Sequence, residues 1–297
     1  MAFAALARWF RDTMAGKVDE GMEMVARFHG AVILLEKFDR EHVRGRLETK
    51  ASHPPREFAI VATYLRTLAH IRTLIQLNNG AHFQAASMIA RAVFELAVDI
   101  RLIDTIEDAP ARYDAFSKVE RLRVARRIVK FHSEHGDAKP SSNAAFEPLE
   151  PNTVYEKYIA DNAGDIDAIA AKYWPKHVEN KKTIPHWSGQ DLRQRALLLG
   201  NPFNEIYDVN YAELSWYTHP GVGAIATLDK EIYPLVCGKA YAIAIRCYCE
   251  TLRFMIGELG LLQSDPLIEK KLEFARLAAF SENQKQADQL RHELLGS

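Results

Sequence analysis

HFQAASMIARAVFELAVDIRLIDT, residues 82–105, is apolar on almost every side of a helix. A helix with this pattern is buried over most of its surface. The helix before it begins near Pro54 and ends at Asn78-Asn79-Gly80, where Gly80 is predicted to adopt a left-handed cap. Because the turn between the two helices is very short, we predict an antiparallel helical hairpin at the centre of the fold.

The rest of the chain also has the punctuation of helices. We expect further helices at 110–136, 155–174, 190–199, 203–221 and 227–260, and one after Asp265. No apolar alternation of period two is bounded by turn residues. The sequence therefore predicts an all-α helical bundle of about eight to ten helices with essentially no sheet.

The domain prediction rests on a break at residues 136–153, which contain Pro140, Pro148 and Pro151. This linker or loop excursion leaves open a division into two domains. Wide apolar faces on the 55–135 helices need partners, so we favour a single domain over 1–297. Residues 1–50 are then an N-terminal helical extension and residues 265–297 a C-terminal one.

Composition excludes several classes of protein. The chain has 297 residues, 48% of them hydrophobic, and a net charge of −1, so no overall field attracts it to nucleic acid or membrane. The apolar region 232–262 is interrupted by charges, which argues against a bilayer span. Cys237, Cys247 and Cys249 suit neither a disulfide framework nor zinc. We expect a cytoplasmic protein without metal or cofactor.

Polar residues on the 82–105 helix recur every four positions, at Ser87, Arg91, Glu95 and Asp99. This spacing places them on one helix face. In one interpretation the face meets water, and Arg91 with Glu95 forms a surface pair contributing about 0.3 kcal/mol. In the other it lies inside the bundle, where the guanidinium and carboxylates must pair with one another or with a ligand.

A second stripe, in the predicted helix 203–221, consists of Tyr207, Tyr211, Ser215 and His219. As a site, the stripe offers phenol hydroxyls, and His219 as an acid or base that activates Ser215 one turn away. The alternative is structural. Tyrosines are often half-buried fillers, and a histidine at a helix C-terminus can stabilise the helix dipole.

Two other segments have both a structural and a functional interpretation. In His186-Trp187-Ser188-Gly189, Ser188 is either an N-cap above a core tryptophan, or His186 and Trp187 line the rim of a pocket as ligand contacts. The predicted helix 110–136 has a cationic outer face that is either solvated or binds phosphate or RNA. That face includes Arg121, Arg123, Arg126, Arg127 and Lys130.

The common catalytic motifs are absent. The chain lacks His-Glu-x-x-His, the phosphate-cradling Gly-x-x-x-x-Gly-Lys, the dinucleotide Gly-x-Gly-x-x-Gly and the Gly-x-Ser-x-Gly elbow. It also lacks the paired Glu-x-x-His motifs of di-iron bundles. No established reaction class is therefore indicated by motif.

In combination, three segments resemble a widespread all-helical bacterial family of unknown function. These are Arg91-Ala-Val-Phe-Glu95, the Trp-Ser-Gly step at 187–189, and the Tyr-x3-Tyr-x3-Ser-x3-His helix at 207–219. The resemblance covers roughly residues 55–260. It implies that the three segments converge on one cluster, and it supplies no activity.

A more distant resemblance is to HEPN-type helical bundles, which are common in toxin–antitoxin and phage-defence systems. Some of them cut RNA, and their nucleolytic mark is an arginine followed four to six residues later by a histidine. Arg127 and His132 have this spacing.

The leading hypothesis is a helical protein with an internal polar pocket for a small anionic or nucleotide-like ligand. Arg91 would bind the anionic group, Glu95 would hold Arg91, and His219 would serve as general base in a hydrolytic or nucleolytic version. The rival is an interaction or scaffold protein, in which the polar cluster only specifies packing. RNA binding by the basic face is a third hypothesis, and the wide apolar helices suggest a homodimer.

Overall fold

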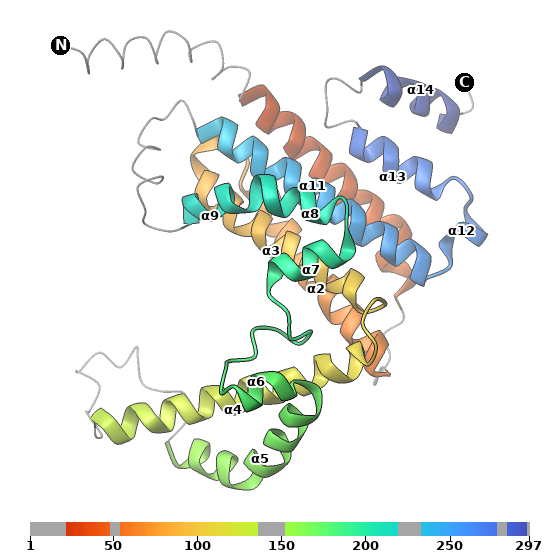
Figure 1. Ribbon diagram of the computed structural model, residues 1–297. Helices are drawn as coiled ribbons and strands as arrows, with labels where there is room; N and C mark the ends of the chain where they lie inside the picture. The colour runs from red at the N-terminus through yellow and green to blue at the C-terminus, as the bar shows by residue number, and fades with distance from the viewer. Residues whose placement is uncertain (1–21, 48–53, 136–151, 219–232, 278–283, 296–297) are drawn as a thin grey trace, which may run out of the picture. The chain divides into compact units, whose positions relative to one another are not determined.

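The computed structural model describes residues 22–47, 54–135, 152–218, 233–277 and 284–295. Of these described residues 86% are helical and none lies in a strand, which confirms the all-α prediction (Figure 1). All but two residues of the predicted 136–153 linker lie outside the described residues.

The chain divides into two compact units. The first comprises 1–53, 60–102 and 192–297, and the second comprises 54–59 and 103–191. The second unit therefore includes the helix before the predicted 136–153 linker and the chain after it as far as residue 191. Whether the chain folds as one domain stays a prediction.

The core of the first unit forms where α3 (Phe83–Leu102) packs along α11 (Tyr233–Glu258). Both helices are buried on most of their faces, as the apolar pattern of 82–105 predicts. Tyr241 of α11 also reaches the end of α2 (Pro55–Gln76), where its hydroxyl lies 2.8 Å from the carbonyl oxygens of Leu74 and Leu77. These carbonyls would otherwise be orphaned at the helix end.

The turn between α2 and α3 differs from the prediction. Gly80 begins a short 3-10 helix, η3 (Gly80–His82), and does not have a positive φ, so the left-handed cap was wrong. Asn79 caps this turn by accepting a hydrogen bond from the backbone N–H of Ala81 at 2.9 Å. A Cβ at Gly80 would lie 3.1 Å from Pro234 of α11, so close approach explains the glycine.

The predicted helix at 203–221 is interrupted. It consists of α8 (Phe203–Ile206), a π-helix η5 (Tyr207–Tyr211) and α9 (Ala212–Thr218), and α7 (Leu192–Leu199) precedes it. A π turn adds a residue to the helical turn. The residues that follow therefore do not continue one straight stripe of period four, although 203–206 and 212–218 are α-helical as predicted. Residues 219–221 of the predicted helix lie outside the described residues.

The remaining described elements of the first unit are short, apart from the helix at 22–38. They are η1 (Asp39–Val43), η2 (Arg44–Arg46), α12 (Leu261–Ser264), α13 (Ile268–Leu277) and α14 (Gln284–Leu295). Among the described helices, α2 is long and apolar enough to cross a membrane, a property that core helices of soluble proteins share.

In the second unit, α4 (Ala109–His135) packs against α5 (Asn152–Tyr173), and α6 (Pro175–Glu179) follows (Figure 1). Pro110 lies in the first turn of α4, as predicted. The buried centre of this unit contains Trp174 and Ile184, together with small side chains from both long helices. Burial of Ile184 anchors the segment after α6 against the α4–α5 pair.

Candidate functional sites

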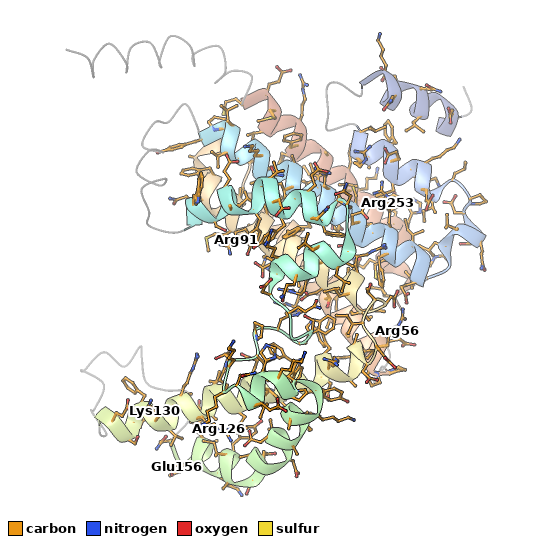
Figure 2. The ribbon with its side chains drawn as sticks, viewed as in Figure 1. Arg56, Arg91, Arg126, Lys130, Glu156 and Arg253 are labelled. Carbon is orange, nitrogen blue, oxygen red and sulfur yellow. The ribbon has the colours of Figure 1, made fainter. Side chains whose placement is uncertain are left out.

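The polar stripe of α3 faces the 207–218 segment in the first unit. Arg91 is labelled in Figure 2. Its guanidinium donates from Nη2 to the Tyr211 hydroxyl at 2.9 Å, and that hydroxyl donates to Glu95 Oε1 at 2.8 Å. These contacts join residues more than a hundred positions apart. The structure therefore brings together Arg91, Glu95 and Tyr211, whose proposed roles as ligand-binding or catalytic groups stay predictions.

Aromatic contacts hold Tyr211 in this position. Its ring stacks on Tyr207 with centroids 5.2 Å apart and lies 5.6 Å from the ring of Phe94. The Arg91 guanidinium carbon lies 4.9 Å from the Tyr211 ring centroid, a cation–π distance. Burial raises the pKa of Tyr211, so the phenol stays protonated and able to donate to Glu95 at neutral pH.

Asp99 continues the polar contacts one turn along α3. It pairs with Arg195 of α7, whose Nη1 lies 2.5 Å from Asp99 Oδ1. Arg195 is only 6% exposed, so this ion pair is largely withdrawn from water. Sequence analysis did not single out Arg195. The sequence indicated only that Asp99, if buried, would need a cation from another helix. It did not indicate which cation.

Three further stripe residues are Ser215, Ser87 and His219. Ser215 donates from Oγ to the Tyr211 carbonyl oxygen at 3.0 Å, a bond within its own helix. Ser87 is fully buried, and its hydroxyl has no hydrogen-bond partner in the described part of the chain. His219, the predicted general base, lies outside the described residues.

The sequence did not predict a buried polar cluster on η1. Asp39 has no exposed surface, accepts a hydrogen bond from the Tyr64 hydroxyl, and lies 3.0 Å from Nη2 of Arg44. Burial and the neighbouring Asp39 carboxylate raise the pKa of Tyr64. The phenol therefore remains a donor, and the carboxylate keeps two partners in an otherwise apolar core.

The His186–Gly189 segment belongs to the second unit, and the predicted role of His186 and Trp187 as ligand contacts stays a prediction. Trp187 is 2% exposed, and its carbonyl oxygen accepts from Trp174 Nε1 at 3.0 Å. Gly189 has φ +76°, and a Cβ there would lie 2.9 Å from the Trp174 ring. Ser188 is not the predicted N-cap, since α7 begins later. It closes a turn with His186, whose Nδ1 lies 3.0 Å from Ser188 Oγ.

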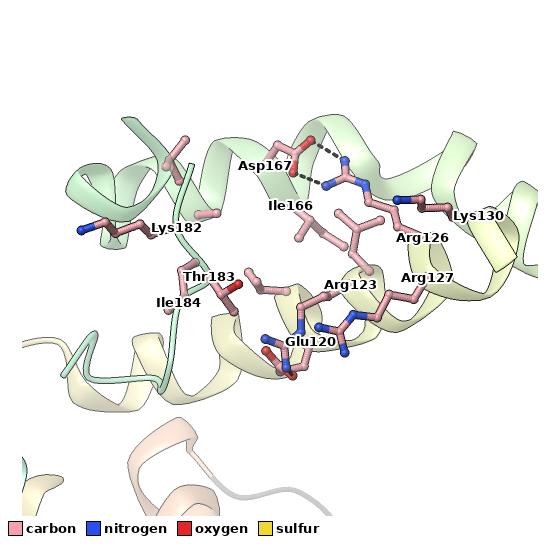
Figure 3. Close-up of a pocket in the computed structure, with 14 residues that line it drawn as sticks. Glu120, Arg123, Arg126, Arg127, Lys130, Ile166, Asp167, Lys182, Thr183 and Ile184 are labelled. Carbon is pink, nitrogen blue, oxygen red and sulfur yellow. Dashed lines mark hydrogen bonds and ion pairs between the residues drawn. The ribbon is translucent and has the colours of Figure 1, made fainter. Parts of the chain in front are cut away.

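The basic face of α4 borders a pocket in the second unit. This cavity of about 340 Å³ lies between α4, α5, α6 and the segment that follows α6 (Figure 3). Its volume falls within the range of small-molecule sites. Its cationic lining side chains are Arg123, Arg126, Arg127, Lys130 and Lys182. The first four belong to the cationic face of α4 that was predicted to bind phosphate or RNA, and Arg121 of that face does not line the pocket.

Ion pairs within the pocket distinguish its cations. Arg126 forms two bonds to Asp167, at 3.1 and 2.7 Å, and Arg123 pairs with Glu120 (Figure 3). Arg127 and Lys182 make no ion pair with any described residue. These two exposed cations are therefore the groups most available to an anion.

Lys182 is held in place by its neighbours in the chain. Its backbone N–H donates to the carbonyl oxygen of His177 at 2.9 Å, and Lys181 before it has φ +52°. Ile184, two residues later, is 8% exposed and packs in the core with Trp174. The backbone beside the pocket is therefore anchored from both sides.

The described residues contain no group of three or more His, Cys, Asp or Glu side chains that could hold a metal ion. The three cysteines are buried in α11 and unpaired. Burial raises the pKa of the Cys237 thiol to about 11, so it stays protonated at neutral pH and is a poor nucleophile.

The fold and these features define an all-helical protein with paired polar contacts in one unit and a basic pocket in the other. The chain belongs to a family of unknown function, DUF5677, whose family model matches residues 57–231. This match confirms the predicted membership of an all-helical family of unknown function. No curated protein and no solved structure matches the chain.

Proposed function

We propose that the protein binds a small anionic ligand in the pocket between α4, α5 and the 182–184 segment. The observation that carries this proposal is the charge of the lining. Five cationic side chains face two carboxylates, Glu120 and Asp167. Such a concentration of positive charge in a hollow attracts anions, and arginine is suited to phosphate in particular.

This proposal moves the ligand away from Arg91, where the sequence had placed it. Arg91 and Glu95 bond to Tyr211, and Asp99 bonds to Arg195, so these polar groups face protein partners. In contrast, Arg127 and Lys182 have no ion pair among the described residues. A ligand phosphate meets less competition from carboxylates at these two cations.

We do not assign a reaction to the pocket. The general base of the hydrolytic or nucleolytic version, His219, lies outside the described residues. The spacing shared with HEPN-type bundles involves Arg127 and His132, which lie five residues apart on α4 and therefore point about 140° apart around the helix. His132 is not among the pocket-lining residues, and it contacts the ring of Phe131. The proposal is one of binding, in a cytoplasmic protein whose cysteines are reduced.

Titration calorimetry of the full chain with inorganic phosphate and pyrophosphate tests the proposal. Arg127→Gln should weaken pyrophosphate binding by about tenfold, the value of one charged hydrogen bond. Arg121→Gln is the matched control, because Arg121 is exposed on the same helix and does not line the pocket. It removes the same charge and should leave the affinity nearly unchanged.

Equal effects of the two substitutions would mean that only the overall field of α4 attracts the anion. Absence of saturable binding to the unaltered chain by phosphate, pyrophosphate and adenosine monophosphate alike would refute the proposal outright.

A second candidate function is that of a non-enzymatic interaction protein. It is favoured by the bonding of the α3 stripe, which joins two parts of the first unit and so can specify their packing. Val209 and Trp216 on the same segment are 66% and 61% exposed, so apolar surface is available beside it. A monomer in sedimentation at every concentration would argue against a homodimer through this surface.

A further inference from the structure

The lining of the second-unit pocket has two chemically different parts. One part is cationic and has been described. The other is apolar and comes from all the elements that surround the pocket. Its members are Val119, Leu122, Ile166, Ala170, Val178 and Ile184. A bare inorganic anion would contact the cations and leave this apolar surface facing water.

Counting ion pairs among the described residues only, the positive charge of the pocket that no carboxylate neutralises is close to two. Arg126 is neutralised by its two bonds to Asp167, and Arg123 by Glu120. Lys130 lies 3.6 Å from Glu134, an exposed partner outside the pocket. Arg127 and Lys182 are left without an ion pair among the described residues. One of them can contact a phosphate directly while the other adds to the positive field of the pocket, and their combined charge suits one phosphomonoester, which carries about −1.5 to −2 charges at pH 7.

These cations flank the apolar part of the pocket. Figure 3 shows Lys182 at one end of the pocket and Arg127 beside Lys130 at the other, with Ile166 between them. A molecule that fills this space therefore meets positive charge at its ends and hydrocarbon along its middle. The Thr183 hydroxyl also faces the pocket and offers a hydrogen bond to a sugar or ester oxygen (Figure 3).

We infer that the ligand of this pocket is an organic phosphomonoester of nucleoside monophosphate size, with its phosphate on Arg127 or Lys182 and its organic part on the apolar lining. This inference rests on the proposed anion-binding function and names the class of ligand. The same charge count disfavours di- and triphosphates, since Asp167 occupies the cation that a second phosphate would need.

The two parts of the lining predict how ligands with and without a phosphate or an organic group differ in affinity. Adenosine monophosphate should bind the full chain at least about tenfold more tightly than either inorganic phosphate or adenosine, because only the nucleotide uses both parts of the lining.

Val178→Ser should weaken adenosine monophosphate binding several-fold without changing phosphate binding. Val178 is 43% exposed, so the substitution spares the core. Val124→Ser, at a residue that is 49% exposed on α4 and outside the lining, is its control.

A second pair of variants tests whether Asp167, by neutralising Arg126, disfavours a second phosphate. Asp167→Asn frees Arg126 and should raise the affinity for adenosine diphosphate relative to the monophosphate by several-fold. Asp161→Asn removes the same charge from α5, at a carboxylate that pairs with Lys157 and does not line the pocket. It should leave the ratio of the two affinities unchanged.

Calorimetry in about 0.15 M NaCl separates the outcomes. If phosphate and adenosine monophosphate bind equally, and Arg127→Gln weakens both, the organic part is not recognised. The inference then fails while the proposed function stands. Tighter binding of an oligouridylate than of the mononucleotide, with steep salt dependence, would overturn the inference in favour of a polymer ligand.

Discussion

The contact between Asp99 and Arg195 gives the sharpest stability prediction. Arg195 is 6% exposed, and the Asp99 side chain retains 16% of its exposure, so neither group is well solvated. Arg195→Met keeps much of the side-chain volume and leaves the carboxylate without this cation. Breaking a buried ion pair from one side costs about 3–5 kcal/mol. We expect a loss near the lower end of this range, because Asp99 keeps some contact with water.

The same helix supplies the control. Arg193 is also on α7, but it lies 4.0 Å from Asp208, and the two side chains are 64% and 53% exposed. An exposed pair contributes less than about 1 kcal/mol, so Arg193→Met should change the free energy of unfolding by no more than that. Urea denaturation followed by circular dichroism measures both variants.

A third variant completes the cycle. Arg195→Met combined with Asp99→Leu removes both charges and should recover part of the stability lost in the single variant, since the carboxylate that lost this cation is also removed. The contact does not stabilise the packing of α7 on α3 if Arg195→Met lowers the free energy of unfolding no more than Arg193→Met does. The same conclusion follows if the double variant loses more free energy of unfolding than Arg195→Met and Asp99→Leu lose separately when added together.

Two further predictions concern backbone packing and pH. Gly80→Ala should lower the melting temperature, because the added methyl would lie 3.1 Å from Pro234 and cost about 1–3 kcal/mol. Gly30 lies in a helix with open space around it, so Gly30→Ala should raise the free energy of unfolding by up to about 1 kcal/mol and with it the melting temperature. A lower melting temperature for Gly30→Ala than for Gly80→Ala would contradict this explanation. A hydrogen bond from Arg276 lowers the pKa of Glu273 from 4.5, so this contact stabilises fully above that pH and is lost as the pH falls below it. Glu273→Gln should flatten the acid-side decline in melting temperature, and an unchanged slope would exclude the contact as a cause.

Much of the secondary structure was predictable because helix signals are local. Pro110 in a first turn, and the apolar pattern of 82–105, identified α4 and α3 with nearly correct ends. The same local rules failed at Gly80, whose conformation depends on Pro234, and at 207–211, where a π turn replaces the regular helix. Neither feature has a signature within a few residues.

The candidate sites were predictable in part. Period-four spacing identified Arg91, Glu95 and Tyr211, since residues four apart share a helix face. It did not identify Tyr211 as their common hydrogen-bond partner, or Arg195 as the partner of Asp99. Those contacts cross about a hundred residues of chain, and amino-acid order alone does not specify which faces meet.

By itself, the sequence determined that this protein is helical, that α3 is a core helix, and that α4 has a cationic face. The tertiary structure decided that polar groups on α3 bond to Tyr211 and Arg195, and that the cationic face borders a hollow. The physical reason is the separation along the chain of the residues that interact. Helix formation depends on bonds between residues four apart, whereas a pocket depends on how α5 and the buried Ile184 pack beside α4.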